Sequence, residues 1–423
     1  MATPLSEHRL TLDPRSIPIV VLTLALVLNF FWRAQLFTGN NLPPVVLLGV
    51  GFVGLWLLRG LAVTGELSLS LPRVLWPICL YVLAVLGSIV VRADFAGRTI
   101  QFALRLLVLL LLTVLVANVI RTLGSLEGAI YLLIAGFTLA ALYGFADYLI
   151  HGRYFLNIFV GIDRKNASGY YFMAIIPFIF FAMRSSEVPR PLRRALMLSL
   201  VLCFGAMLLT LSRSALVALV AGLGMVFVLY SRRINVRVVV LLVVLAAGAY
   251  FLAPESVKYR LSTTFDFEQR ADTSNSSRLI LLRAGLRMAR DHPLAGVGVG
   301  RFDENLDSYI SPQERELLGF ETYEASHNQY VAALNDGGIL ALLGVVWLLY
   351  MLLRGLHSLL KRPDLPRRHL FMAFAALWWI QTVHFFLEWQ LARELFWFLL
   401  GLTAAGFILT PEPAPESSGE TST

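Results

Sequence analysis

The side chains best suited to chemistry lie at the boundaries of long apolar segments. His327 and Asn328 stand directly before an apolar run that extends from about residue 328 to residue 353. An imidazole titrates near neutral pH, so it can accept and return a proton during a reaction. Near a helix N-terminus, the positive end of the helix dipole favours the neutral ring, which is the form that accepts a proton. We therefore interpret His327 as a candidate general base; the alternative is that it only caps or anchors the helix.

Several basic residues occupy comparable boundary positions. Arg213 lies in a tight turn between two apolar runs, and Arg278 lies in the first turn of a predicted helix within a long polar segment. A guanidinium group keeps its charge and binds phosphate with two parallel hydrogen bonds. The alternative for any one of these arginines is that it only extends to water from a helix end. The other polar residues at similar depth are Arg98, Gln101 and Arg105, spaced i, i+3, i+7, and Arg164, Lys165 and Asn166.

The elements that must position these residues are membrane helices. Apolar residues make up 57% of the 423-residue chain, and its mean hydropathy is +0.72. Runs of about 20 apolar residues recur from end to end, and each can cross a hydrocarbon core of ~30 Å. We predict an all-α polytopic membrane protein with about twelve transmembrane helices. The predicted spans are residues 17–37, 43–58, 74–91, 99–120, 128–150, 167–183, 194–211, 214–230, 236–252, 328–353, 370–391 and 393–410.

The distribution of Lys and Arg predicts the orientation. One set of short loops, with the N-terminus, holds 17 basic residues, whereas the opposite short loops hold eight. Because cytoplasmic loops carry the excess of Lys and Arg, both termini are predicted to be cytoplasmic. The long loop of about residues 253–327 then faces outward. We expect residues 1–410 to form one integral membrane domain, and the polar, Pro-rich residues 411–423 to form a disordered cytoplasmic tail.

The outer loop contains a predicted amphipathic helix. It begins at Ser276 or Ser277, ends near Arg290, and is stopped by His292 and Pro293. One face is basic, another is apolar, and such a helix is expected to lie on or near the outer membrane face. The basic residues are Arg283, Arg287 and Arg290, and the apolar residues are Leu279, Leu282 and Leu286.

The ionisable residues at membrane depth gather at the predicted outer ends of the spans. They include Asp147, and also His384 and Glu388, which are four residues apart and are expected on one helix face. An ion-coupled transporter places such groups near the bilayer midplane, whereas an enzyme that acts on a lipid head group places them at one membrane face. The pattern favours the enzyme. The net charge of +8 does not indicate nucleic-acid binding, because the basic residues lie mostly in short loops.

Four segments, in this order, resemble one known family. They are DRKNASGYYFM from residue 163, LTLSRSALVAL from residue 209, SRLILLRAGLRMARDHPLAGVGVGRF from residue 277, and SHNQYVAALNDGGILALLG from residue 326. Together they are similar to the O-antigen ligase and polymerase superfamily of bacterial envelope glycosyltransferases. The chain departs from the family pattern at NDGG, where we expect Asp336 to stand for the acidic residue that often follows the histidine helix.

This resemblance implies a glycosyltransferase of the bacterial inner membrane with its site facing the periplasm. The donor would be a glycan on undecaprenyl pyrophosphate. The acceptor would be lipid A–core in the ligase branch, a carrier-linked repeat in the polymerase branch, or a protein hydroxyl in a third branch. We favour the ligase branch because the chain is compact. A lipid-linked-glycan transporter is the alternative from a different class.

The resemblance also implies roles for residues. His327 would be the base, and Arg213 and Arg278 would stabilise the departing pyrophosphate. We expect no cofactor and no metal, although Asp266, Glu268, Asp303 and Glu304 offer an alternative site for Mg²⁺ or Mn²⁺. The predicted substrate-binding residues are Arg164, Lys165, Asn166, Arg105, Arg98, Asn328 and Arg301.

Overall fold

The computed structural model describes residues 51, 55, 70–93, 95, 97–152, 155–158, 165–230, 273–319 and 325–411. Within these residues the chain forms helices and no β-strand. Seven helices in this part of the chain are long and apolar enough to cross a membrane. They are α3 (Trp76–Val91, preceded by the 3₁₀ turn Arg73–Leu75), α4 (Gly97–Val119), α5 (Leu123–Ile150), α6 (Lys165–Arg184), α7 (Arg190–Leu209), α8 (Arg213–Tyr230) and α14 (Gln329–Lys361).

Two shorter helices, α15 (Arg368–His384) and α16 (Glu394–Leu409), complete the described bundle, and α16 is strongly apolar. Nine of the predicted spans therefore coincide with helices of the structure. The other three, 17–37, 43–58 and 236–252, fall outside the described residues, apart from positions 51 and 55. The boundaries of two spans were wrong. The run predicted at 328–353 continues as α14 to Lys361. The run predicted at 370–391 is helical only to His384, because residues 385–393 leave the helix before α16 begins.

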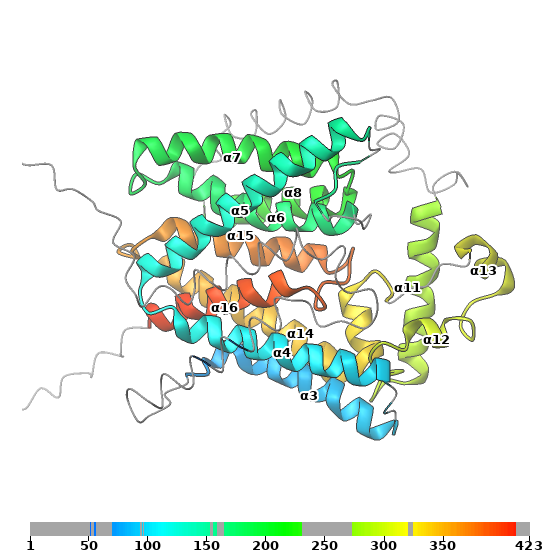
Figure 1. Cartoon of the computed structure of the whole chain (residues 1–423). Coiled ribbons are helices and arrows are strands. Elements are labelled where there is room, and N and C mark those ends of the chain that lie inside the picture. The colour runs from blue at the N-terminus through cyan, green and yellow to red at the C-terminus, as the bar shows by residue number, and fades with distance from the viewer. Residues whose placement is uncertain are drawn as a thin grey trace, which may run out of the picture.

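The long helices lie side by side and reverse direction at the two ends of the bundle (Figure 1). The core is built mainly by α6, α15 and α16, whose large side chains are fully buried, among them Tyr171, Phe178 and Trp397. Glycines let neighbouring helices approach closely. A methyl group on Gly222 of α8 would collide with Ile380 of α15, and one on Gly344 of α14 would collide with the backbone at Pro77 and Tyr81 of α3.

Helix α14 is interrupted by a kink at Gly337 and Gly338, which have non-helical backbone angles. Because of this interruption, the carbonyl oxygen of Asn335 is available to groups outside the helix. This oxygen accepts hydrogen bonds from the amides of Val297 and Gly298 at 2.8 and 3.0 Å. The glycine-rich turn after α11 is thereby docked into the kink. The sequence prediction of a turn at this position is confirmed, since Gly296, Gly298 and Gly300 all have positive φ.

A small cap covers one end of the bundle. Helix α11 (Thr273–Asp291) runs across the ends of the long helices, and α12 (Phe302–Leu306) and α13 (Pro312–Leu318) pack beside it (Figure 1). The predicted outer-loop helix is therefore present, and Arg283, Arg287 and Arg290 are exposed as expected. The predicted apolar face is not the side of α11 that packs in the cap. The residues of α11 packed in the cap are Ile280, Leu281, Ala284 and Met288, whereas Leu279 and Leu286 are about half exposed.

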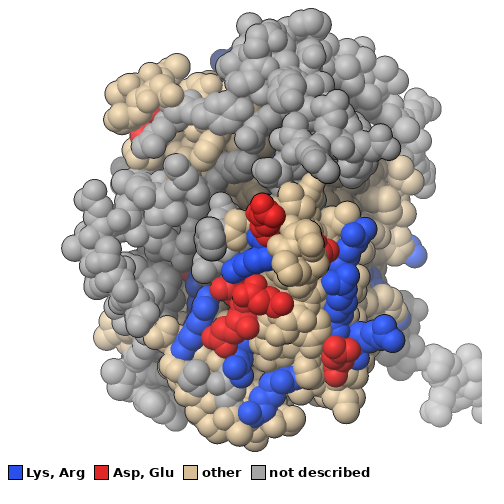
Figure 2. Space-filling view, turned by 90° about the vertical axis from the view of Figure 1, so that its right-hand side faces the viewer, with Lys and Arg blue, Asp and Glu red and all other residues tan. Residues whose placement is uncertain are grey.

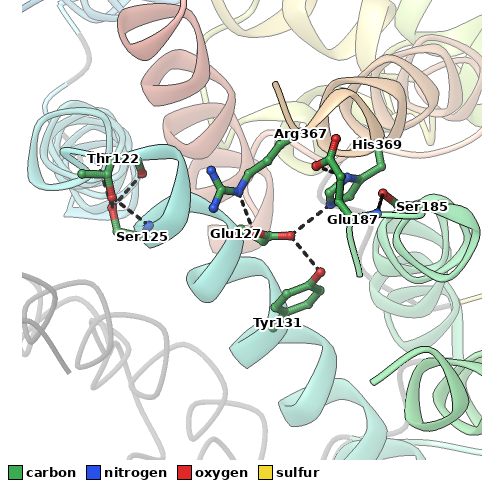
Figure 3. A network of polar contacts seen from close by, with 8 residues as sticks. All are labelled: Thr122, Ser125, Glu127, Tyr131, Ser185, Glu187, Arg367 and His369. Atoms are coloured by element: carbon green, nitrogen blue, oxygen red, sulfur yellow. Dashed lines mark hydrogen bonds and ion pairs between the residues drawn. The ribbon is translucent and has the colours of Figure 1, made fainter. Parts of the chain in front are cut away.

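A polar cluster that the sequence did not single out lies at the opposite end of the bundle (Figure 3). Glu127 of α5 accepts hydrogen bonds from Arg367 at 2.6 Å, from Tyr131 at 2.9 Å and from His369 at 3.1 Å. The other ring nitrogen of His369 lies 3.7 Å from Glu187, in the connection between α6 and α7. The cluster ties α5 to the start of α15, because Glu127 comes from α5 and its partners Arg367 and His369 come from the start of α15.

Candidate active site

The candidate site lies at the capped end, where α6, α11 and α14 begin and the segment 385–393 turns back toward α16. Viewed from outside, this end carries basic side chains on both sides of a group of acidic ones (Figure 2). The same end holds the turn at Arg213. The structure therefore brings together at one end of the bundle several residues that are far apart in the sequence.

Asn328 and Gln329 fix the geometry at the start of α14. Asn328 caps the helix, because its side-chain oxygen accepts hydrogen bonds from the amides of Tyr330 and Val331 at 3.0 and 3.1 Å. The fully buried Gln329 accepts hydrogen bonds from the amides of Gln390 and Leu391 at 2.8 and 2.9 Å. These bonds replace the helical hydrogen bonds that the segment 385–393 lacks. They also hold this segment against the start of α14.

His327 directly precedes Asn328, the N-cap residue of α14, and has a positive φ of 52°. The alternative that this histidine caps α14 is wrong, because Asn328 has that role. The His327 side chain is 35% exposed, so its ring is partly open to solvent. Its Nδ1 atom lies 3.2 Å from a carboxylate oxygen of Glu388. The ring is therefore held on one side and partly accessible.

Glu388 is the centre of the site. Its side chain is only 5% exposed, and it has partners from three different parts of the chain. One carboxylate oxygen accepts hydrogen bonds from Arg278 of α11 at 2.5 Å and from Asn166 of α6 at 2.9 Å. The other oxygen faces His327. Three of the predicted site residues thus converge on one buried carboxylate.

These neighbours keep Glu388 ionised. Burial alone would raise the pKa of this carboxyl, because the charged form loses its hydration. The hydrogen bond with His327, followed by the charge of Arg278, outweighs burial and lowers the pKa of Glu388 to about 2. The carboxylate is therefore a fixed negative charge that orients the groups around it.

Arg213 is the first residue of α8 and is partly buried. The preceding residue, Ser212, packs against Gly169, where even a methyl group would collide with the serine. The turn between α7 and α8 therefore lies against the first turn of α6, which also carries Asn166. This contact places Ser212, the residue before Arg213, near the start of α6, three residues along the helix from Asn166.

The remaining predicted residues are spread over the same end. Arg105 makes a 2.8 Å ion pair with the buried Glu394 at the start of α16, and Arg301 makes a 2.9 Å ion pair with Glu304. Arg98 and Gln101 are exposed on α4, so the predicted polar stripe does not line one buried surface. Arg164 and the side chain of Lys165 lie outside the described residues, as do Asp266 and Glu268.

Two residues of this end were not recognised as site residues from the sequence. Glu388 was noted only as a helical neighbour of His384; that was wrong, because the helix ends at His384. Its charge within an apolar stretch was the available signal. Arg92, at the end of α3, was counted only as a loop residue. Its side chain and that of Arg301 both flank Gly298. Burial, followed by the nearby charge of Arg301, lowers the pKa of Arg92.

The site combines one basic ring, one buried carboxylate and several guanidinium groups. Such a set can accept a proton at His327 and bind a phosphate-bearing group through arginine. Among the residues that the structure describes, no group of three or more His, Cys, Asp or Glu side chains could hold a metal ion.

Comparison with known proteins agrees with this chemistry. A search of the curated proteins finds no match. Residues 198–346, about a third of the chain, match the family model described as O-antigen ligase, Wzy_C. The matched region contains Arg213, Arg278 and His327. The family and the apolar helices together indicate a multi-pass membrane protein with ligase- or polymerase-type activity on lipid-linked glycans. The similarity to O-antigen ligases is carried by this matched region of the chain.

Proposed function

We propose that this protein transfers a glycan from an undecaprenyl-pyrophosphate carrier to the lipid A–core oligosaccharide at the periplasmic face of the inner membrane. The observation that carries the proposal is the convergence of His327, Arg278 and Asn166 on the buried carboxylate of Glu388. This group lies at the capped end of the helix bundle, and the proposal is that the head group of the lipid-linked donor binds there.

In the proposed reaction, a hydroxyl oxygen of the acceptor sugar attacks the anomeric carbon of the donor. A carbon–oxygen bond forms there as the bond from that carbon to the pyrophosphate breaks, and the bonding electrons leave with the pyrophosphate. His327 takes the proton of the attacking hydroxyl. The proton then passes to solvent or to the departing pyrophosphate, which regenerates the neutral ring.

Arginines stabilise the charge that develops on the leaving pyrophosphate. Arg278 and Arg213 have this role in the proposal, because both lie in the matched region, Arg278 contacts Glu388, and Arg213 begins α8. Arg98, Arg164, Lys165, Arg301 and Asn166 are proposed to bind the carrier or the acceptor. Asn328 caps α14 and Arg105 is paired with Glu394, so we expect these two residues to support the site instead of contacting substrate.

The proposed transfer needs no metal, because several guanidinium groups supply the positive charge that a divalent cation would otherwise provide. Purified protein assayed with and without EDTA tests this point. Equal rates are expected. Activity that is abolished by EDTA and restored by Mg²⁺ or Mn²⁺ would overturn the metal-independent mechanism.

The central test uses protein in nanodiscs with undecaprenyl-pyrophosphate glycan and lipid A–core. We expect the core lipid to gain the glycan with the wild type and not with His327→Ala. His292→Ala, which alters a histidine at the same end outside the Glu388 cluster, should remain active. Longer carrier-linked chains without transfer to the core would assign the protein to the polymerase branch. No glycosidic product from folded protein with either acceptor would favour a transporter.

A further inference from the structure

Glu388 is shared by the two side chains that the proposed transfer needs most. One of its oxygens lies 3.2 Å from His327 Nδ1, and the other accepts a hydrogen bond from Arg278 at 2.5 Å. A base and a pyrophosphate-binding arginine are thus held by opposite oxygens of one buried carboxylate. Any change in the partner of Arg278 must alter the electrostatic surroundings of His327.

We propose that Glu388 is a positioning residue that couples donor binding to activation of His327, by orienting the histidine ring and competing with the donor pyrophosphate for Arg278. This inference rests on the proposed function. It goes beyond that function because it assigns a role to a residue outside the family-matched region, which ends at residue 346.

The first half of the role concerns the tautomer of His327. An ionised carboxylate can only accept hydrogen bonds, so Nδ1 of the ring must carry the hydrogen that faces Glu388. Nε2 then has the free lone pair that accepts a proton from a sugar hydroxyl. The carboxylate also stabilises the imidazolium ion that forms when the proton is taken up.

The second half concerns Arg278. Its side chain is 27% exposed, so it lies at the boundary between the buried carboxylate and the open side of the site. A pyrophosphate carries more negative charge and more acceptor oxygens than one carboxylate, and a guanidinium has five N–H donors. A bound donor is therefore expected to draw Arg278 away from Glu388. Once Arg278 no longer neutralises the carboxylate, Glu388 makes His327 a stronger base when the donor is in place.

The other groups near Glu388 do not remove this coupling. Asn166 is neutral and donates to the same oxygen as Arg278, so it can hold the carboxylate in place when the arginine moves. His384, at the end of α15, contributes to the potential at Glu388, and Arg393 lies over the ring of Tyr170. Of the charged groups, Glu388 contacts His327 directly, and Arg278 contacts Glu388.

A binding experiment tests the competition. Protein in nanodiscs is titrated with farnesyl pyrophosphate, a prenyl pyrophosphate that lacks the glycan. Glu388→Gln removes the competing charge and should bind the probe about threefold or more tightly, whereas Arg278→Gln should bind it more weakly. Glu316→Gln alters an exposed carboxylate of α13 and should bind as the wild type does. Equal or weaker binding by Glu388→Gln would overturn the competition.

A second experiment follows the ring itself and requires no turnover. Modification of His327 by diethyl pyrocarbonate is measured against pH by mass spectrometry of the peptide that contains it. The titration of His327 should move to lower pH in Glu388→Gln and to higher pH in Arg278→Gln. Glu388→Asp, which keeps the charge, should stay closer to the wild type. A purely structural role for Glu388 would leave these titrations in place, and that result would refute the positioning role.

The outcomes separate this inference from the proposed function. If Arg278→Gln binds farnesyl pyrophosphate as tightly as the wild type, the site does not bind pyrophosphate through Arg278 and the proposed function fails at that point. If Arg278→Gln weakens binding but Glu388→Gln neither tightens it nor shifts His327, only the coupling through Glu388 fails.

Discussion

At the scale of single residues, the site depends on groups whose chemistry cannot be exchanged for a similar charge. Arg213 begins α8 beside the first turn of α6. If its guanidinium binds pyrophosphate with two parallel hydrogen bonds, lysine cannot reproduce that geometry. We expect Arg213→Lys to lower kcat/KM at least about tenfold, which corresponds to about 1.4 kcal/mol of transition-state stabilisation. Steady-state transfer assays measure this. An unchanged rate would mean that Arg213 serves only membrane topology.

The ionisation of Glu388 leads to a prediction about stability. Because the folded-state pKa is about 2, below the ordinary value of 4.5, the carboxylate stabilises the fold above about pH 4.5 and loses this contribution as the pH falls toward 2. Glu388→Gln has no ionisable group at this position. The melting temperature of the wild type should therefore exceed that of the variant by a constant margin near neutral pH, and this margin should shrink below about pH 4.5.

Melting curves from about pH 7 to pH 3 in the same detergent test this prediction. Glu316→Gln, which alters an exposed carboxylate, should follow the wild type across the whole range. A margin for Glu388→Gln that stays constant down to pH 3 would show that the carboxylate is not held ionised by its neighbours.

At the scale of elements, the kink of α14 connects the cap to the bundle. Gly338 has a φ of 69°, and a methyl group there would collide with the backbone at Leu294. Gly338→Ala should therefore strain α14 and displace the turn that follows α11, at a cost of about 1–3 kcal/mol. We expect this strain to lower the melting temperature. We also expect weaker transfer activity, because the displaced turn is joined to α11, the helix that carries Arg278.

A matched control for this variant is Gly87→Ala in α3. No atom lies within 4 Å of the added methyl group at that position, and alanine favours a helix more than glycine does. Gly87→Ala should therefore keep or raise the melting temperature. If Gly338→Ala behaves like Gly87→Ala, the kink does not anchor the cap.

The Glu127 cluster leads to a prediction at the opposite end of the bundle. Glu127→Gln removes the charge that pairs with Arg367 and that faces His369, so both side chains lose their common carboxylate partner (Figure 3). Breaking such a partly buried network is expected to lower the melting temperature by several degrees. At a temperature where the variant is folded, transfer kinetics should stay close to those of the wild type, since the cluster is far from Glu388.

Asp364→Asn is the matched control for Glu127→Gln, because Asp364 is exposed at the same end of the bundle. Its melting temperature should equal that of the wild type. A Glu127→Gln variant with a normal melting temperature would mean that the cluster does not stabilise the fold. A large loss of turnover in folded Glu127→Gln would contradict its separation from the site.

At the scale of the whole molecule, the sequence predicts the helices better than the contacts between them. Apolar runs of membrane length lead directly to helices such as α5 and α14, since an apolar segment of that length can satisfy its backbone in lipid only as a helix. The segment 385–393 has no proline or glycine and resembles a helix in composition. Its departure from helix is accompanied by hydrogen bonds that the amides of Gln390 and Leu391 donate to Gln329, about 60 residues earlier in the chain.

Three residues of the candidate site could be predicted from the sequence, but the carboxylate at its centre could not. His327 and Arg278 were predicted from segments that resemble the family, and Asn166 from its place in a polar group at the start of a span. Glu388 joins all three across 61, 110 and 222 residues of sequence, and no local pattern specifies contacts at such separations. The buried face of α11 was also missed for this reason, because α12 and α13 determine which of its leucines are covered.

The orientation of the whole bundle gives the last prediction. If the site faces the periplasm, the turn between α12 and α13 lies outside and the connection between α14 and α15 lies in the cytoplasm. Ser308 and Asp364 are exposed in these two places. With Cys79 and Cys203 replaced by alanine, Ser308→Cys should react with a membrane-impermeant maleimide in cells whose outer membrane has been opened. Asp364→Cys should react only after the inner membrane is also permeabilised. The reverse pattern would place Glu388 and His327 on the cytoplasmic side, where a carrier-linked glycan awaiting transfer to lipid A–core is not expected, and would refute the proposed reaction.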